Sequence, residues 1–132
     1  PVGAVVVQKR NAEILAAFSN QMRSTGSSLA HAEMLALQKS MELIKNERLL
    51  GCDMYVSLEP CPMCASAISI ANIKNLFYGA SDPKSGGIER GPRIFSHEQS
   101  HFKTNIFNGF HEEETRNLMQ DFFLSLRVSN QK

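Results

Sequence analysis

The stretch MYVSLEPCPMC, residues 54–64, joins a predicted strand directly to a predicted helix. Its first five residues form an apolar run of strand length. Pro62 suits the first turn of the helix that follows, because its missing amide proton is not needed there. Ala65 and Ile68 continue this helix to about Asn72. A strand that leads straight into a helix indicates an α/β fold.

The N-terminal part of the chain follows the same pattern. Residues 2–7 are rich in β-branched side chains and, with residues 12–18, predict a hairpin across a polar turn. A polar loop is expected over residues 19–28. A helix is expected over residues 30–46, because its apolar side chains fall at helical spacing: Met34, Leu37, Met41 and Ile44.

The rest of the chain alternates in the same way and contains no repeat or linker. It predicts a strand over residues 76–80, a long loop over 81–92, an ambiguous segment over 94–110 and an amphipathic helix over 112–126. Strands that alternate with helices predict an α/β sandwich. We expect one domain over residues 1–132.

Composition narrows the classes of protein. The chain has 132 residues, 42% of them hydrophobic, and no apolar run that approaches a membrane span. A net charge of +1 does not predict a general nucleic-acid binder, so an RNA partner would need a local basic patch. If two of the three cysteines hold a metal, Cys52 is left alone. This favours a reducing compartment, and we expect the cytoplasm.

Two short motifs supply metal ligands. His31 precedes Glu33 by two residues, and Cys61 and Cys64 form a C-x-x-C pair. One imidazole and two thiolates are one ligand short of a closed structural zinc site, which leaves a position for water. The predicted helix N-termini stabilise thiolates and lower cysteine pKa values. A structural zinc site, or a redox pair without metal, is the alternative.

The combination of H-x-E with P-C-x-x-C resembles the signature of zinc-dependent deaminases that act on cytosine or adenine. The resemblance implies one Zn²⁺ per chain, held by His31, Cys61 and Cys64. It also implies hydrolytic chemistry, in which Glu33 takes a proton from a zinc-activated water and returns it to the base.

Longer stretches resemble the bacterial tRNA-specific adenosine deaminases: PVGAV at 1–5, HAEMLAL at 31–37, residues 55–67, FYGASDPKSG at 77–86 and DFF at 121–123. The resemblance implies conversion of adenosine to inosine at the wobble position of a tRNA anticodon, by a homodimer. It implies a three-layer α/β/α sandwich with a mixed central sheet, of the cytidine deaminase-like kind. That family has a helix before its first strand, whereas this sequence starts at the strand, so we expect a fragment.

The same resemblance implies residues that contact the substrate. By position, Asn20 matches an asparagine that contacts the target base, and Asp82 and Lys84 match a loop that approaches the RNA backbone. Phe122 and Phe123 match a C-terminal helix near the substrate. Each has a structural alternative: Asn20 as a cap, Asp82 as the start of a turn at a proline, and the two phenylalanines as core.

Three other functions stay open. His97-Glu98-Gln99-Ser100-His101 fits the H-E-x-x-H pattern of metalloproteases, although a solvated helix or loop explains it as well. A free-base guanine or cytosine deaminase could carry the same zinc motif. An RNA-binding module without activity is the third, and an intact Glu33 argues against it, because a binder needs no proton shuttle.

Overall fold

The computed structural model describes residues 2–100 and 102–109, and five single positions further on. A five-stranded mixed sheet forms the centre, with the strand order β2-β1-β3-β4-β5. Its strands are β1 (Gly3–Gln8), β2 (Glu13–Ser19), β3 (Cys52–Leu58), β4 (Asn75–Ala80) and β5 (Asn105–Asn108). The helices are α1 (Met22–Thr25), α2 (Ala32–Ile44) and α3 (Pro62–Ile70), and a 3₁₀ turn spans Ile94–Ser96.

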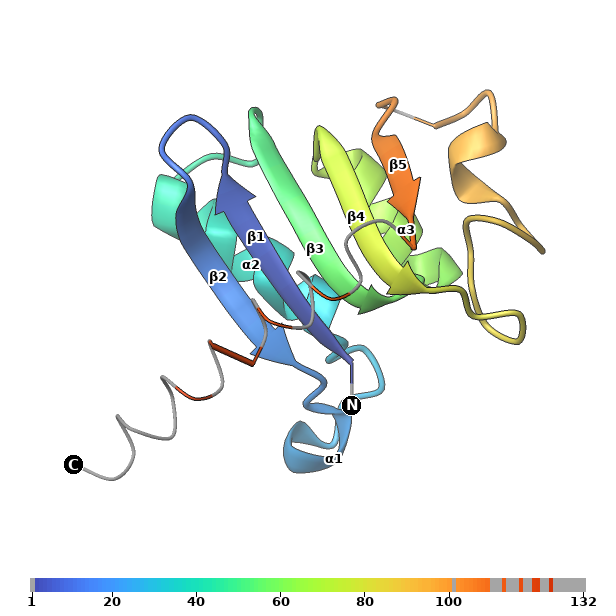
Figure 1. The fold of residues 1–132 in the computed structure, drawn as a ribbon, viewed down its shortest axis with the longest axis horizontal. Coiled ribbons are helices and arrows are strands. Elements are labelled where there is room, and N and C mark those ends of the chain that lie inside the picture. Colours follow the sequence, from blue (N-terminus) through green and yellow to red (C-terminus); the bar gives the residue numbers. More distant parts are fainter. Residues whose placement is uncertain are drawn as a thin grey trace.

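The sheet combines an antiparallel and a parallel half. β1 pairs antiparallel with β2 and with β3, whereas β3, β4 and β5 are parallel. The predicted hairpin is therefore confirmed, and so is the mixed sheet. Helices α2 and α3 both lie behind the sheet in the view of Figure 1. The predicted helix over residues 112–126 falls, except for single positions, outside the described residues.

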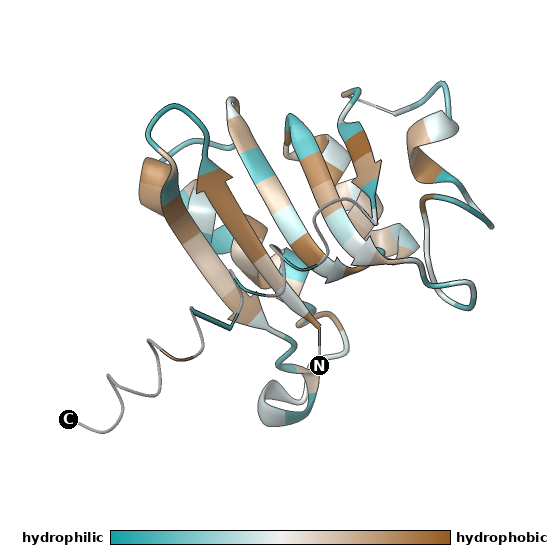
Figure 2. Cartoon of the chain, viewed as in Figure 1, coloured by the Kyte–Doolittle hydropathy of each residue, from teal (hydrophilic) through white to brown (hydrophobic). Residues whose placement is uncertain are grey.

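The core lies between the sheet and these two helices. Strand side chains such as Val6, Met54 and Tyr78 have no more than 1% exposure. Figure 2 shows hydrophobic residues along the strands and hydrophilic ones in the β1–β2 turn. On α2, Leu37 is buried as predicted, but Ala36 lies beside it on the buried face, and Met34 is only half-buried. Small alanines let the helix pack close to the sheet.

Two elements differ from the sequence-based expectations. Residues 19–28 are not all loop, because α1 forms within them; Thr25 donates both its N–H and its hydroxyl to the Gln21 carbonyl. The ambiguous segment contains β5, a short edge strand that pairs with β4. Neither element buries a run of apolar side chains, so hydrophobic periodicity could not find them.

The fold brings two helix N-termini together. Three residues separate the end of β3 from the start of α3, and Pro62 lies in the first turn of the helix, as predicted. α2 starts at Ala32, directly after His31, and packs against α3. In the described part of the chain, no helix combines the length and apolar character needed to cross a membrane.

Candidate metal centre

His31, Cys61 and Cys64 meet where α2 and α3 begin. His31 is the residue that caps α2, Cys61 caps α3, and Cys64 lies in the first turn of α3. His31 Nδ1 is 3.5 Å from Cys64 Sγ and 3.7 Å from Cys61 Sγ. All three ligand atoms lie within 4.8 Å of one another. In the described part of the chain this is the one such group, and neither Cys52 nor a carboxylate belongs to it.

These separations fit a tetrahedral zinc ion. Zinc lies about 2.3 Å from a thiolate sulfur and about 2.0–2.1 Å from an imidazole nitrogen. At a tetrahedral angle, those bonds separate sulfur and nitrogen by about 3.6 Å. The two distances from His31 Nδ1, 3.5 and 3.7 Å, bracket that value. The imidazole nitrogen therefore lies at the distance from each sulfur that a shared zinc ion would require.

The two thiols also favour a cation. A hydrogen bond from Cys64 lowers the pKa of Cys61 to about 5, and backbone N–H groups at the start of α3 act in the same direction. The same hydrogen bond, together with burial, raises the pKa of Cys64. Without a cation only one thiol of the pair ionises, because two adjacent thiolates repel each other. A divalent ion would remove this conflict and ligate both sulfurs.

Glu33 lies beside this group, buried and without a partner for one oxygen. The side chain is 3% exposed, and its Oε1 accepts no hydrogen bond within the described residues. Burial raises the pKa of Glu33, and the Cys61 thiolate adds to this, whereas His31 opposes it. An unpaired buried carboxylate oxygen costs about 1–3 kcal/mol, so the arrangement favours a partner from outside the chain.

Asn20 is placed to act on the start of α2. Its side-chain Oδ1 accepts the N–H of Ala32 at 2.8 Å, one of the backbone donors that a helix leaves unpaired at its N-terminus. The structural alternative for Asn20 was the capping of a turn, whereas the structure shows a bond to the start of α2. The Asn20 amide nitrogen makes no hydrogen bond within the described part of the chain.

Asp82 and Lys84 lie in the loop that follows β4. Asp82 Oδ1 accepts the N–H groups of Lys84 and Ser85, both at 3.1 Å, so the carboxylate forms a turn around Pro83. Lys84 is exposed. Among the described residues the one ion pair joins Lys39 to Glu42, at 3.9 Å, so no described carboxylate pairs with Lys84. Phe122 and Phe123 lie outside the described residues.

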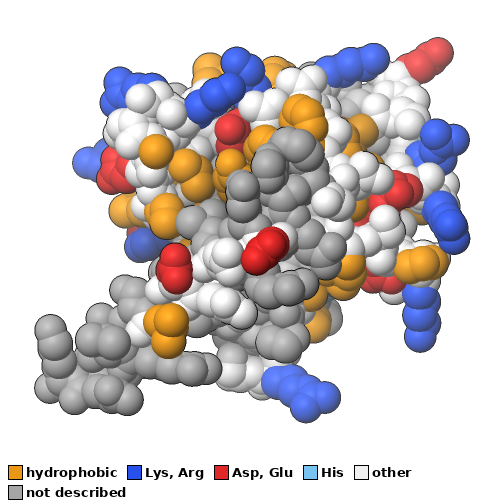
Figure 3. Space-filling view, viewed as in Figure 1, with side chains coloured by type: hydrophobic (Ala, Val, Ile, Leu, Met, Phe, Trp, Pro, Cys, Tyr) orange, Lys and Arg blue, Asp and Glu red, His pale blue; other side chains and the backbone are white. Residues whose placement is uncertain are grey.

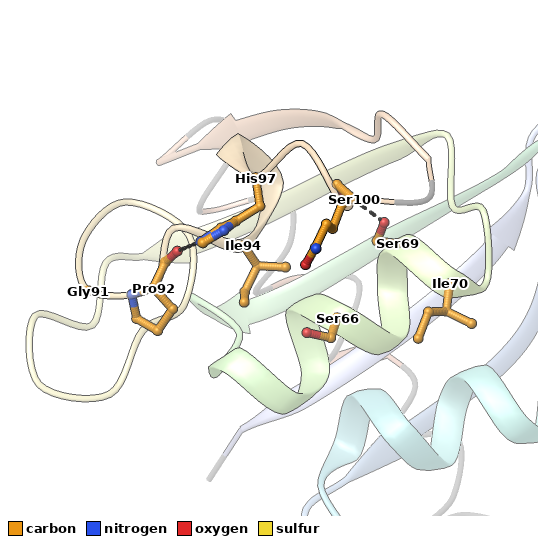
Figure 4. A pocket seen from close by; sticks show the side chains of 9 residues that line it. Ser66, Ser69, Ile70, Gly91, Pro92, Ile94, His97 and Ser100 are labelled. Atoms are coloured by element: carbon orange, nitrogen blue, oxygen red, sulfur yellow. Dashed lines mark hydrogen bonds between the residues drawn. The ribbon is translucent and has the colours of Figure 1, made fainter.

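The H-E-x-x-H segment is not helical. His97 follows the 3₁₀ turn in extended conformation, and its Nε2 contacts the Pro92 carbonyl oxygen. It lines a pocket of about 540 Å³ between α3 and this loop, together with Ser69 and Ser100, whose hydroxyls are bonded to each other (Figure 4). His101 lies outside the described residues. The metalloprotease hypothesis needs both histidines on one helical face, so the structure disfavours it.

Sequence reasoning missed Glu59, the buried acidic residue that precedes the Pro-Cys pair. Glu59 is 5% exposed, and its carboxylate accepts three backbone N–H groups of the loop after β4. The one available signal was the position of this acidic residue directly after an apolar strand, where a buried carboxylate needs hydrogen-bond partners.

Comparisons with known proteins agree with this site. The family model of MafB19-like deaminases matches residues 1–127. A tRNA-specific adenosine deaminase of Agrobacterium fabrum is 40% identical over 130 residues, 98% of this chain and 84% of that protein. A solved structure from a study of A-to-I editing by tRNA:A34 deaminases has a TM-score of 0.81 and 42% identity, over 89% of this chain and 83% of that one.

A guanine deaminase structure from Bacillus subtilis is similar over a shorter range. Its TM-score is 0.59, with 38% identity over 61% of this chain and 50% of that chain. The chain belongs to the MafB19-like deaminases and, with 40% identity over nearly its whole length, to the bacterial tRNA-specific adenosine deaminases. The predicted cytidine deaminase-like α/β fold is thereby confirmed.

Proposed function

We propose that this protein hydrolytically deaminates adenosine to inosine at the wobble position of a tRNA anticodon. The observation that carries the proposal is the unpaired, buried carboxylate of Glu33 beside His31, Cys61 and Cys64. The full-length similarity to tRNA-specific adenosine deaminases supports the choice of substrate.

The side chains divide the work as follows. His31, Cys61 and Cys64 would hold one zinc ion per chain, which supplies a Lewis acid that activates water. Glu33 Oε1 accepts a proton from the attacking water and delivers it to the ring nitrogen beside carbon 6. It then assists the departure of ammonia, so that adenosine and water give inosine and ammonia.

Loop cations are the proposed contacts of the RNA backbone. Lys84, Arg90 and Arg93 are exposed and lie in or beside the loop after β4. On the face drawn in Figure 3, Lys and Arg side chains are spread along the rim and form no continuous patch. We therefore propose that the individual cations of this loop bind the phosphates, and that the overall charge of the protein contributes little to RNA binding.

The substrate is tested by comparing an anticodon stem-loop with free bases. The zinc-loaded protein is expected to form inosine in the stem-loop and to release little ammonia from free adenine, guanine or cytosine. A loop base is already unstacked, so its extrusion costs less than the few kcal/mol needed in a duplex. Inosine is measured by nucleoside chromatography. Rapid turnover of free guanine without inosine in any stem-loop would replace the proposal by a free-base deaminase.

Asn20→Asp separates base recognition from helix capping. Aspartate keeps an acceptor for the Ala32 N–H and places a charge at the helix N-terminus, where it is favourable, so thermal stability is expected to hold. The amide donor is lost, and we expect kcat/KM for the stem-loop to fall by about tenfold or more. Asn20→Ala is the control that loses both roles. If Asn20→Asp keeps full activity, Asn20 only caps α2.

The homodimer stays a prediction of the family resemblance, because the structure describes a single chain. We also propose that the protein works in the cytoplasm. The support is its three free cysteines, Cys52, Cys61 and Cys64, which suit a reducing compartment.

A further inference from the structure

The carboxylate of Glu59 is the anchor of the loop after β4. Its Oε1 accepts the N–H of Asp82 at 3.0 Å, and its Oε2 accepts the N–H groups of Ile88 and Glu89, also at 3.0 Å. A buried carboxylate without such donors would be very unfavourable. These three bonds tie both ends of the loop to one side chain. None of the steps proposed above uses Glu59.

Two glycines let the loop approach this closely. A Cβ atom on Gly86 would lie 2.4 Å from the Cδ and Oε2 atoms of Glu59. A Cβ atom on Gly87 would lie 2.7 Å from backbone atoms of Pro62. The Gly87 N–H also bonds to the Pro60 carbonyl at 2.8 Å. The loop therefore rests directly on the segment that carries Cys61.

A second network holds the end of the loop. Glu89 accepts the hydroxyl of Tyr78 at 2.8 Å, the hydroxyl of Ser81, and the side-chain amide of Asn108 at 3.2 Å. Tyr78 is fully buried in β4, so this network connects the loop to the sheet. The exposed Lys84 projects from the segment between Asp82 and Ile88, both of which Glu59 holds.

We propose that Glu59 is a positioning residue, whose carboxylate fixes the loop of residues 81–90 beside the metal centre so that its exposed Lys84 and Arg90 can bind the RNA backbone. The inference rests on the proposed function, because it assigns tRNA binding to this loop. Glu59 does not belong to the group of possible metal ligands, and its carboxylate is occupied by the three N–H groups of the loop. Its loss should weaken the binding of the stem-loop and leave the chemical step intact.

Glu59→Gln tests this role with almost no change in size. The oxygen of the substituted side chain can still accept the N–H groups of Ile88 and Glu89. The NH₂ group of the same side chain then faces the N–H of Asp82, so that two donors oppose each other. We expect KM for an anticodon stem-loop to rise by about tenfold, with kcat within about twofold and zinc content unchanged. Glu13→Gln, at the exposed start of β2, removes the same charge far from the loop and is the matched control.

Salt dependence is the readout that a merely structural role would not change. Each phosphate contact to single-stranded nucleic acid adds about 0.7 to the slope of log affinity against log salt. If Lys84 and Arg90 lose their positions, the slope in Glu59→Gln should fall by about 1.4, whereas Glu13→Gln should keep the slope of the unaltered protein. Lys84→Ala should show part of the same decrease.

Gly86→Ala disturbs the same contact from the loop, because the added methyl group would collide with the Glu59 carboxylate, while Glu59 itself is unchanged. It is expected to raise KM in the same way, and the double variant with Glu59→Gln should be no worse than the more severe single one. Equal salt slopes in Glu59→Gln and the unaltered protein, or a loss of zinc together with kcat, would overturn the positioning role. Failure of the unaltered protein to form any inosine would instead refute the proposed function.

Discussion

Glu33→Gln is expected to lower the rate of deamination by about a hundred- to ten-thousand-fold, the range that general acid–base catalysis contributes. The amide can neither accept the proton of the attacking water nor return it to the base. The metal ligands His31, Cys61 and Cys64 are untouched, so one zinc per chain should remain. Single-turnover inosine formation and elemental analysis of the same sample measure both quantities.

Stability separates this effect from misfolding. In the metal-free protein, folding raises the pKa of Glu33 above its ordinary value of 4.5, so the folded state disfavours the ionised form and loses stability as the pH rises past that value. Replacement by a neutral amide removes this cost at neutral pH. The unfolding temperature of metal-free Glu33→Gln should therefore not fall below that of the metal-free unaltered protein. Near-normal turnover in this variant would mean that another group moves the protons.

Cys64→Ser is expected to abolish stoichiometric zinc and to reduce activity by more than about a thousandfold, because the Lewis acid that generates the nucleophile is lost. Cys64 is fully buried at the start of α3 and provides one of three ligand atoms. With two ligands left, the site cannot hold the ion tightly. Zinc is measured after gel filtration in the presence of a weak chelator.

Cys52→Ala is the matched control for this experiment. Cys52 is also buried, but it lies in β3 outside the ligand group, and burial raises the pKa of its thiol. We expect this variant to keep one zinc per chain and its activity, with a modest loss of stability. Full zinc content in Cys64→Ser, or loss of zinc in Cys52→Ala, would contradict the assignment of the ligands.

Local patterns were enough to predict the parts of the site that are close in sequence. The spacing of His31 and Glu33, and that of Cys61 and Cys64, placed both pairs at helix starts, where the structure has them. The hairpin followed from two apolar stretches on either side of a polar turn, and α2 followed from the helical spacing of its apolar residues. In each case the residues that form the pattern lie within the same turn, strand or helix as the structure that they predict.

The anchoring of the loop could not be predicted in this way. The hydrogen-bond partners of Glu59 lie 23 to 30 residues further along the chain. They are backbone N–H groups, which nearly every residue has, so residue identity does not show which of them will bond. β5 was missed for a related reason, because it is stabilised by pairing with β4 and not by burial of its own side chains. Asn20 was predicted as a substrate contact from the family resemblance. Its hydrogen bond to the start of α2 could not be predicted, because it forms only when the folded chain brings the two segments together.

The three possible metal ligands come from segments on either side of α2 and β3, which bears on how this protein unfolds. His31 precedes α2, whereas Cys61 and Cys64 follow β3, so an ion bound by all three is a crosslink that encloses a helix and the central strand of the sheet. The unfolded chain does not hold these three ligands together, so the ion would bind the native state alone, and by mass action its contribution to stability would grow with the concentration of free zinc. The melting temperature of this protein is therefore expected to rise with the concentration of zinc in the buffer.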